Sequence, residues 1–332
     1  MYNKLTPIKE MNFHFDLSVV TPLFNEGENI SELFKAFLEL EDKSSLRIQW
    51  IAVDDGSQDD TFANLKHCHD KNPNLVEIVR FSRNFGQHKA IMSGLRASNA
   101  PLIAIMDGDL QSLPLDLLRL KKKLESGFDC VSVRFLQKSE FFLKKVFSRI
   151  FWLLMSRLSG FEISPNQGTM RLMTWRFVEE LKNLNDNIPF FAGMCSWVGF
   201  PQTYIIVEQR PRFKGKAKYT FLKNLNLAWD GISSFSIIPL RIAGILGIFF
   251  SIAGLLSGIY LIYNRIFHNH GIEGWTSIMV TLLLGNGVQL LILGIIGEYL
   301  GRNYQQSLQR PQVIISDHIK TQICQNKQIR SN

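Results

Sequence analysis

The sequence predicts an α/β protein with a mostly parallel sheet, followed by two membrane-spanning helices. Two observations predict this fold class. Short apolar runs alternate with segments of helical periodicity up to residue 134, and two long apolar runs occupy residues 237–263 and 275–301. Strands that alternate with helices form a sheet with helices on both faces. Each long run can cross the roughly 30 Å hydrocarbon layer of a bilayer as one helix.

Five strands are expected in the first part of the chain. Each is a short run, rich in apolar and β-branched residues, that stops at polar residues; the five runs are 17–24, 48–55, 76–82, 101–109 and 128–134. Apolar residues at helical spacing lie between them, at 30–40, after Thr61, at 88–98 and at 115–126. We therefore expect a Rossmann-like, mostly parallel sheet in this part of the chain.

Polar side chains gather where these strands end. They are Asn25 and Glu26, Asp54 and Asp55, Arg83 and Asn84, Asp107 and Asp109, and Arg134. In open parallel sheets the ligand lies outside the carboxyl ends of the strands. The sequence therefore predicts an active site at this edge of the sheet.

The fourth strand ends in two carboxylates, Asp107 and Asp109, with Gln111 two residues further on. Two carboxylates at this spacing can share one hard cation, Mg²⁺ or Mn²⁺, whose other ligands are commonly phosphate oxygens. An amide oxygen of Gln111 could complete the set, and the cation would neutralise a diphosphate leaving group. The alternative interpretation is an aspartate-rich turn that caps the helix beginning near Pro114.

The acids at the first two strand ends have two interpretations as well. Asp55 could accept hydrogen bonds from a nucleobase or ribose, and Glu26 could hold the sugar end of a nucleotide, but both could also serve as turn or helix-start residues. Neither the Gly-x-Gly-x-x-Gly pattern nor a P-loop occurs in the chain. This absence argues against a dinucleotide oxidoreductase and a P-loop enzyme.

The two long apolar runs predict a hairpin of membrane spans. The connecting residues 264–274 are short, the segment after residue 301 is basic, and residues 1–15 carry no apolar signal core. We therefore expect a multi-pass protein of the inner (cytoplasmic) membrane, with both termini cytoplasmic and 264–274 outside. The alternative is two buried helices of a large soluble core, which rarely stay apolar on every face.

The net charge indicates which kind of molecule the protein binds, and the cysteine spacing indicates the state of its thiols. The formal net charge of +8 suits an anionic partner, and the apolar spans favour phospholipid and phosphorylated lipid over nucleic acid. Residues 141–160 combine basic and aromatic side chains in a pattern typical of an amphipathic interface helix, or else of a helix packed on the sheet, and residues 219–236 predict a second interfacial helix. The four cysteines have no metal-binding spacing and indicate reduced thiols.

Four stretches together resemble family 2 glycosyltransferases of the GT-A fold: LSVVTPLFNEGENI, IAVDDGSQDDT, FSRNFGQHKAIMSGL and IAIMDGDLQSLP. The continuation GTMRLM, WVGF, RPRFKGKAKY and LAWDGISSFSIIPLR, followed by two spans, is similar to the polyisoprenyl-phosphate glycosyltransferases. That group includes bactoprenol glucosyltransferases, dolichyl-phosphate mannose synthase and undecaprenyl-phosphate aminoarabinose transferases. The resemblance covers residues 16–310 and implies a cytoplasmic GT-A domain at 16–218, ahead of the interfacial helix, the two spans and a cytoplasmic tail at 302–332.

The resemblance also implies an activity. It is the inverting transfer of one sugar from a nucleotide-sugar, UDP more than GDP, to undecaprenyl phosphate on the cytoplasmic leaflet. The product would serve cell-envelope glycans such as those of O-antigen or lipid A modification. A homotetramer is expected from the resemblance alone. The sugar itself is not identified by the sequence.

The resemblance assigns a role to each matching residue. The nucleotide pocket would be lined by Pro22, Phe24, Glu26, Val53, Asp55, Met106, Asp107 and Gly108. The metal ligands would be Asp107, Asp109 and Gln111. Phosphate groups and the acceptor would be met by Arg134, Arg171, Arg210, Arg212 and Lys218. Of all these, Asp107, Asp109, Arg134 and Arg171 are the expected catalytic residues.

The chain departs from its relatives at Asn166 and Thr169, where many of them carry acids. A lipid phosphate has a second pKa near 6 and is largely ionised at neutral pH, so it needs positioning and charge screening rather than a base. Two other functions stay open. A processive polysaccharide synthase would carry a Gln-x-x-Arg-Trp motif and more spans, whereas a non-catalytic scaffold would not need the acids at the end of the fourth strand.

Overall fold

The computed structural model describes residues 13–135, 167–184, 191–207, 238–268 and 274–322. They fall into two compact units: one contains the sheet and residues 311–322, and the other contains the two long apolar helices. The expected interface helices at 141–160 and 219–236 lie outside the described residues, as do Arg210, Arg212 and Lys218.

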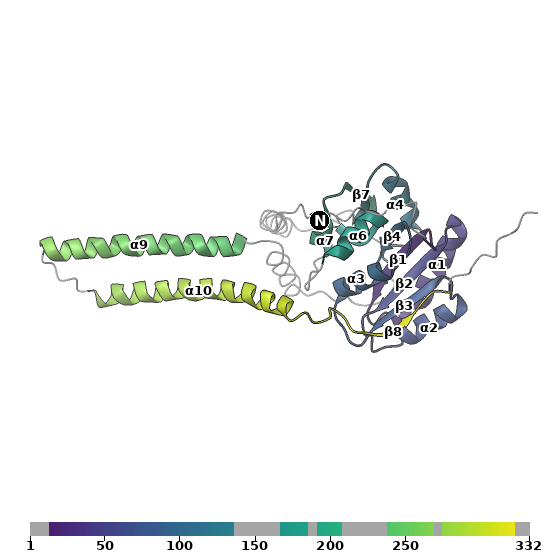
Figure 1. Cartoon of the computed structure of the whole chain (residues 1–332), viewed down its shortest axis with the longest axis horizontal. Coiled ribbons are helices and arrows are strands. Elements are labelled where there is room, and N and C mark those ends of the chain that lie inside the picture. The colour runs from purple at the N-terminus through teal and green to yellow at the C-terminus, as the bar shows by residue number, and fades with distance from the viewer. Residues whose placement is uncertain (1–12, 136–166, 185–190, 208–237, 269–273, 323–332) are drawn as a thin grey trace, which may run out of the picture. The chain divides into compact units, whose positions relative to one another are not determined.

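The first unit is built on one eight-stranded sheet of order β7-β5-β6-β4-β1-β2-β3-β8 (Figure 1). The strands are β1 (Leu17–Leu23), β2 (Ile48–Asp54), β3 (Val76–Phe81), β4 (Leu102–Ile105), β5 (Cys130–Phe135), β6 (Gln167–Thr174), β7 (Gln202–Val207) and β8 (Ile315–Ile319). Strands β1 to β4 are parallel to their neighbours among themselves, and β5 is parallel to β7. Strands β6 and β8 pair antiparallel with their neighbours. The sheet is therefore mixed but mostly parallel, as the sequence predicts.

Helices cover both faces of this sheet. They are the short η2 (Gly27–Asn29), then α1 (Ile30–Ser44), α2 (Thr61–Lys71), α3 (Gln87–Ala97), α4 (Asp116–Leu124), α6 (Trp175–Asn183) and α7 (Phe191–Val198). α1, α2 and α4 contribute to one continuous buried cluster on one face, whereas α3 packs against β1, β2 and α6. All five expected strands and the four helices expected between them are present. Strands β6, β7 and β8 lie outside the five expected ones.

Helix α1 shows why the expected periodicity holds. Its buried residues Ile30, Leu33, Phe34, Phe37 and Leu40 recur at helical spacing and form one face. The ring of Phe37 stacks on the fully buried Trp50 of β2, with 4.6 Å between the ring centroids. The indole Nε1 of Trp50 donates a hydrogen bond of 3.1 Å to Oγ1 of Thr21. This packing fixes the order of β1 and β2, whose carboxyl ends carry the first two expected site loops.

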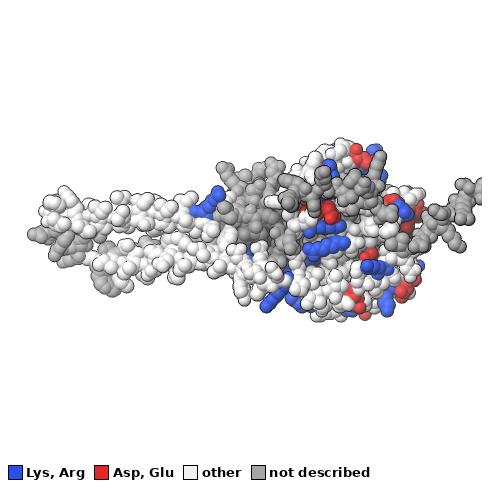
Figure 2. Space-filling view, viewed as in Figure 1, with Lys and Arg blue, Asp and Glu red and all other residues white. Residues whose placement is uncertain are grey.

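The second unit is a helical hairpin of α9 (Ile238–His268) and α10 (Trp275–Ser307), which lie side by side (Figure 1). Both are long and apolar enough to cross a membrane, at Leu240–Tyr260 and Ile278–Ser307. Only 6% of the first apolar window and none of the second is buried. Figure 2 shows their surface almost without charged side chains. The alternative of two helices buried in a soluble core is therefore wrong.

Candidate active site

The carboxyl ends of β1, β2, β3 and β4 lie at one edge of the sheet because these four strands are parallel. The residues that follow them form four connecting segments, at 24–29 (which includes η2), 55–60, 82–86 and 106–115. These loops contain Phe24, Glu26, Asp55, Met106, Asp107, Gly108, Asp109 and Gln111, while Pro22 and Val53 are near the ends of β1 and β2. The structure thus brings the expected nucleotide and metal residues to one edge.

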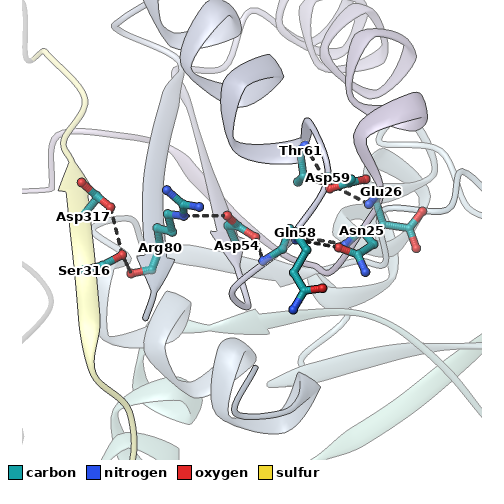
Figure 3. A network of polar contacts seen from close by, with 10 residues as sticks. Asn25, Glu26, Asp54, Gln58, Asp59, Thr61, Arg80, Ser316 and Asp317 are labelled. Carbon is teal, nitrogen blue, oxygen red and sulfur yellow. Dashed lines mark hydrogen bonds and ion pairs between the residues drawn. The ribbon is translucent and has the colours of Figure 1, made fainter. Parts of the chain in front are cut away.

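The loops after β1 and β2 are joined by hydrogen bonds (Figure 3). The backbone N–H of Asn25 donates to Oγ of Ser57 at 2.9 Å, and the N–H of Gln58 donates to Oδ1 of Asn25 at 2.9 Å. The N–H of Glu26 donates to Oγ1 of Thr61 at 2.9 Å. The backbone at Glu26 is therefore fixed by α2, which allows its carboxylate to be presented from a rigid loop.

Asp54 and Asp55 both hold loops in place. The N–H of Ser57 donates to Oδ1 of the fully buried Asp54 at 2.9 Å. Asp55 accepts hydrogen bonds from the N–H groups of Phe85 at 2.7 Å and Gly86 at 2.9 Å, one on each carboxylate oxygen. Burial raises the pKa of Asp55 above its usual value, and the two N–H bonds partly oppose this. Asp55 thus orders the β3–α3 loop, in addition to its expected role toward the nucleotide.

The turn after β2 and the loop after β3 are also in direct backbone contact. Gly56 has φ of +69°, and a Cβ at this position would lie 2.4 Å from the carbonyl carbon of Arg83. Only glycine fits both the left-handed conformation and this close approach. The two loops therefore form one rigid wall beside the ends of β2 and β3.

The expected metal residues form a tight turn after β4. Nε2 of Gln87 donates a hydrogen bond of 2.8 Å to Oδ1 of Asp107, and the N–H of Gln111 donates to Oδ1 of Asp109 at 3.2 Å. Leu110 between them has φ of +59°. A Cβ on Gly108 would lie 2.3 Å from Cδ2 of Leu23, so this turn packs directly on the end of β1.

The chemistry of this turn fits a hard divalent cation. Asp107, Asp109 and Gln111 supply only oxygen ligands, and all three are partly exposed. Within the described residues no group of three or more His, Cys, Asp or Glu side chains is arranged to hold a metal. Mg²⁺ and similar ions commonly use one or two carboxylates and take their remaining ligands from water and substrate phosphates. The residues present therefore suit an ion that completes its shell with a bound diphosphate.

Two of the expected catalytic residues lie on β5 and β6. Arg134 is partly exposed, and its guanidinium lies 4.3 Å from the ring centroid of Tyr204 on β7. Arg171 is buried, donates through Nη1 to Sγ of Cys195 at 3.2 Å and lies 5.0 Å from the ring centroid of Phe191. Among the described residues no carboxylate pairs with Arg171. Its register partner on β4 is Ile105, two residues before Asp107.

The positive charge of Arg171 acts on the groups around it. Burial, with the Arg171 charge as a smaller cause, lowers the pKa of His88 to about 4, so this imidazole is neutral at pH 7. Burial raises the pKa of the Cys195 thiol, which keeps it protonated beside the guanidinium. Among the described residues, Arg171 is thus a cation with no carboxylate partner, set in a neutral, aromatic environment near the end of β4.

Comparison with known proteins agrees with this arrangement. A family model described as glycosyl transferase family 2 matches residues 18–200, more than half of the chain. The chain belongs to glycosyl transferase family 2. A second model, the GtrB C-terminal hairpin, matches residues 238–302 and so coincides with the α9–α10 hairpin.

Proteins named as glycosyltransferases are similar to this chain over nearly its whole length. An uncharacterized glycosyltransferase of Synechocystis sp. is 36% identical, with 91% of this chain and 95% of that protein covered. The bactoprenol glucosyl transferase of Shigella phage SfX is 33% identical, with 90% and 98% covered. Among solved structures, glucosyl-3-phosphoglycerate synthase from Mycobacterium tuberculosis is 16% identical with a TM-score of 0.46, covering 67% of this chain and 79% of that one.

This family 2 protein is a glycosyltransferase, and its first unit has the GT-A type of fold that the sequence resemblance implies. Sequence reasoning missed Gln87, which contacts Asp107, and Arg80, which pairs with Asp54. The signal for Gln87 was its place directly after Gly86, at the start of a helix that follows a strand. Arg80 lies inside a strand, where the sequence offers no comparable signal.

Proposed function

We propose that this glycosyltransferase moves one sugar from a nucleotide-sugar, UDP-linked by preference, to a polyprenyl phosphate. The observation that carries the proposal is the presence, in one chain, of the carboxylate turn at Asp107–Asp109 and of two helices able to span a membrane. A soluble acceptor would not require such a hairpin. Relatives named as bactoprenol glucosyl transferases, with 90% of this chain covered, support a lipid acceptor.

The proposed reaction is a single displacement. A phosphate oxygen of the lipid attacks the anomeric carbon of the sugar, a new C–O bond forms, and the bond from that carbon to the diphosphate oxygen breaks. The nucleoside diphosphate leaves with the electron pair, and the anomeric configuration inverts. Because the attacking phosphate is already ionised, no side chain needs to take its proton. The acids that many relatives carry at the positions of Asn166 and Thr169 are therefore not needed here.

The chain's residues supply binding and charge screening. Asp107, Asp109 and Gln111 would hold a divalent cation, Mg²⁺ or Mn²⁺, which when bound screens the charge of the leaving diphosphate. The rigid wall formed by the turn at Asp54–Ser57 and the loop at Arg83–Gly86 would line the nucleoside side of the site. Arg134 and Arg171 would attract the phosphate groups of the donor and the acceptor.

We further propose that α9 and α10 cross the cytoplasmic membrane with both termini inside, which places the sheet on the cytoplasmic side. The basic residues near the end of α10 and after it, among them Arg302 and Arg310, favour this orientation under the positive-inside rule. The basic segments that contain Arg210, Arg212 and Lys218 would then meet the lipid phosphate. The product would be a lipid-linked monosaccharide for cell-envelope glycans.

A donor screen tests this function. The full-length protein in lipid nanodiscs is incubated with undecaprenyl phosphate, Mn²⁺ and a panel of UDP- and GDP-sugars, and the lipid product is identified by mass. We expect one hexose-sized addition to the lipid phosphate, lost with EDTA and reduced at least a hundredfold in turnover by Asp109→Asn. A polymeric product would instead establish a processive synthase, and no transfer from any donor would overturn the proposal. Full turnover of Asp109→Asn in EDTA would overturn the metal role.

A further inference from the structure

One of the two edge strands of the sheet, β8, comes from the C-terminal part of the chain. Strand β8 follows α10 through residues 308–314 and pairs antiparallel with β3. It lies beyond both matched family regions, which end at residues 200 and 302. Its register sets His318 opposite Val79 and Asp317 opposite Arg80, and then shifts so that Ile315 is opposite Phe81. Ser316 is the extra residue of this β-bulge.

The bulge holds the end of β3. Oγ of Ser316 donates a hydrogen bond of 3.3 Å to the carbonyl oxygen of Arg80 (Figure 3). The N–H of Ser82 donates to the carbonyl of Ile314 at 2.9 Å. Bulges of this kind re-aim side chains and are common beside active sites. Strand β8 thus fixes the backbone on both sides of Phe81.

The other end of β8 is held by two contacts to Glu77 of β3. Nε2 of His318 lies 2.7 Å from Oε1 of Glu77, a carboxylate that is 4% exposed, and Oγ1 of Thr321 donates to Oε2 of the same residue at 3.4 Å. A buried carboxylate is stable only with such partners. The C-terminal strand is therefore an integral part of the sheet edge.

Arg80 extends from this edge to the donor side of the site. Its Nε lies 3.4 Å from Oδ2 of Asp54, the residue beside it on β2, and its guanidinium stacks 4.2 Å above the ring of Phe62. Asp54 is fully buried, and its Oδ2 accepts no hydrogen bond from the described residues. No other ion pair to Asp54 occurs in the described part of the chain. Arg80 is therefore the cation that offsets the desolvation cost of burying this carboxylate.

Asp54 connects Arg80 to the loops after β1 and β2 by an ion pair and hydrogen bonds. Its other oxygen holds the N–H of Ser57, whose hydroxyl in turn accepts the N–H of Asn25. The next residue, Asp55, holds Phe85 and Gly86. A carboxylate without its cation would rotate or take up water, and the turn it anchors would lose its fixed position.

We propose that Arg80 is a positioning residue for the nucleotide-sugar, acting through Asp54, and that the C-terminal strand β8 holds Arg80 in place. This inference rests on the proposed function, because the loops concerned are those assigned to the donor. Strand β8 thereby makes donor binding depend on a segment that lies beyond the second apolar helix. Arg134 and Arg171, the proposed phosphate-binding residues, are on β5 and β6 and are not part of this chain of contacts.

The first test compares Arg80→Gln with Arg80→Lys in full-length protein. Arg80→Gln should raise KM for the donor about tenfold, with kcat and KM for undecaprenyl phosphate within threefold of wild type. Arg80→Lys keeps the charge and should stay within threefold in all three constants. A general structural defect would lower kcat and the melting temperature together. An unchanged donor KM in Arg80→Gln, or equal changes in both KM values, would overturn the proposal.

A second test does not depend on turnover. Amide hydrogen exchange of Ser57, Phe85 and Gly86 should accelerate at least fivefold in Arg80→Gln, while exchange in β5 and β6 stays as in wild type. Unchanged exchange at these three amides would overturn the inference even if no donor were found. If exchange is accelerated but no donor gives transfer, the proposed function would be overturned. The dependence of the loops at Ser57 and Phe85–Gly86 on Arg80 would still be established.

The role of β8 is tested by Ser316→Pro/Asp317→Pro against Ser316→Ala/Asp317→Ala. Successive N–H groups of a strand point to opposite sides, so adjacent prolines remove whichever one pairs with β3. The proline variant should reproduce the raised donor KM and the faster exchange of Ser57, and the alanine variant should show less than half of either effect. A proline variant that matches wild type in both would show that β8 does not hold Arg80.

Discussion

The side-chain amide of Gln87 donates a hydrogen bond of 2.8 Å to Oδ1 of Asp107. This contact joins the first residue of α3, which follows β3, to the turn that follows β4, although β1 and β2 lie between these two strands in the sheet. It fixes the rotamer of a carboxylate that is expected to bind metal. Groups that orient a metal ligand are commonly worth ten- to a hundredfold in metal affinity.

Gln87→Ala should therefore weaken metal activation about tenfold. The measurement is transferase activity as a function of Mn²⁺ concentration, with donor and acceptor saturating. Gln306→Ala, an exposed amide near the end of α10, is the control and should leave the Mn²⁺ curve unchanged. An unaltered half-saturating Mn²⁺ concentration in Gln87→Ala would show that Asp107 does not need this donor.

Gly56→Ala should disrupt the wall formed by the turn after β2 and the loop after β3. Its new Cβ would lie 2.4 Å from the carbonyl carbon of Arg83, so one of the two loops must move. We expect at least a tenfold loss of donor affinity, measured by calorimetric titration with UDP. Gly127 is the matched control, because it also has positive φ, +100°, but nothing within 4 Å of an added Cβ. Equal effects of both substitutions would indicate backbone strain alone.

His88 should make the folded state sensitive to mild acid. Its pKa is lowered to about 4, below the usual 6.5, so between these values the unfolded chain binds more protons than the folded one. The contribution of His88 to stability is complete above pH 6.5 and is lost as the pH falls toward 4, by on the order of 3 kcal/mol.

The measurement is the denaturant midpoint at pH 7.0, 5.5 and 4.5. His88→Gln cannot take up this proton and should show a shallower fall than wild type, which separates His88 from the other groups that titrate in this range. Parallel curves for the two proteins would contradict the prediction.

The amides on α10 predict self-association. Asn286 and Gln289 are exposed within the apolar stretch and lie one helical turn apart, so they share a face of α10. Polar side chains at membrane depth usually hydrogen-bond to another helix. Asn286→Leu/Gln289→Leu should therefore shift the detergent-solubilised protein to smaller particles in light scattering after gel filtration. Leu283→Ala/Leu290→Ala, which removes no polar group, should not. An unchanged mass would assign these amides another role.

Much of the first unit follows from local patterns. The runs ending at Leu23, Asp54 and Ile105 are short and apolar, and the helices between them have clear periodicity, so parallel strands with functional ends are predictable. The same patterns bring Glu26, Asp55 and Asp107 to one edge. They say nothing of which side chains meet across strands, which is why Gln87 escaped notice.

Arg171 shows another limit of local patterns. The sequence suggests a phosphate contact, whereas the structure adds burial, a thiol partner in Cys195 and an aromatic neighbour in Phe191. Strand β8 was missed for a related reason. Residues 315–319 form a brief, largely exposed segment in a polar tail, and its pairing with β3 depends on contacts that no local window contains.

The pairing of β3 with β8 has a consequence for biosynthesis. Arg80 and Ser316, joined by a hydrogen bond, are 236 positions apart in the chain. At about 5–20 residues per second, the ribosome completes β3 roughly ten to fifty seconds before β8 exists. Both apolar helices are made within that interval. The edge of the nascent sheet at β3 can pair with foreign strands throughout this interval, and the exposure ends when β8 pairs with β3.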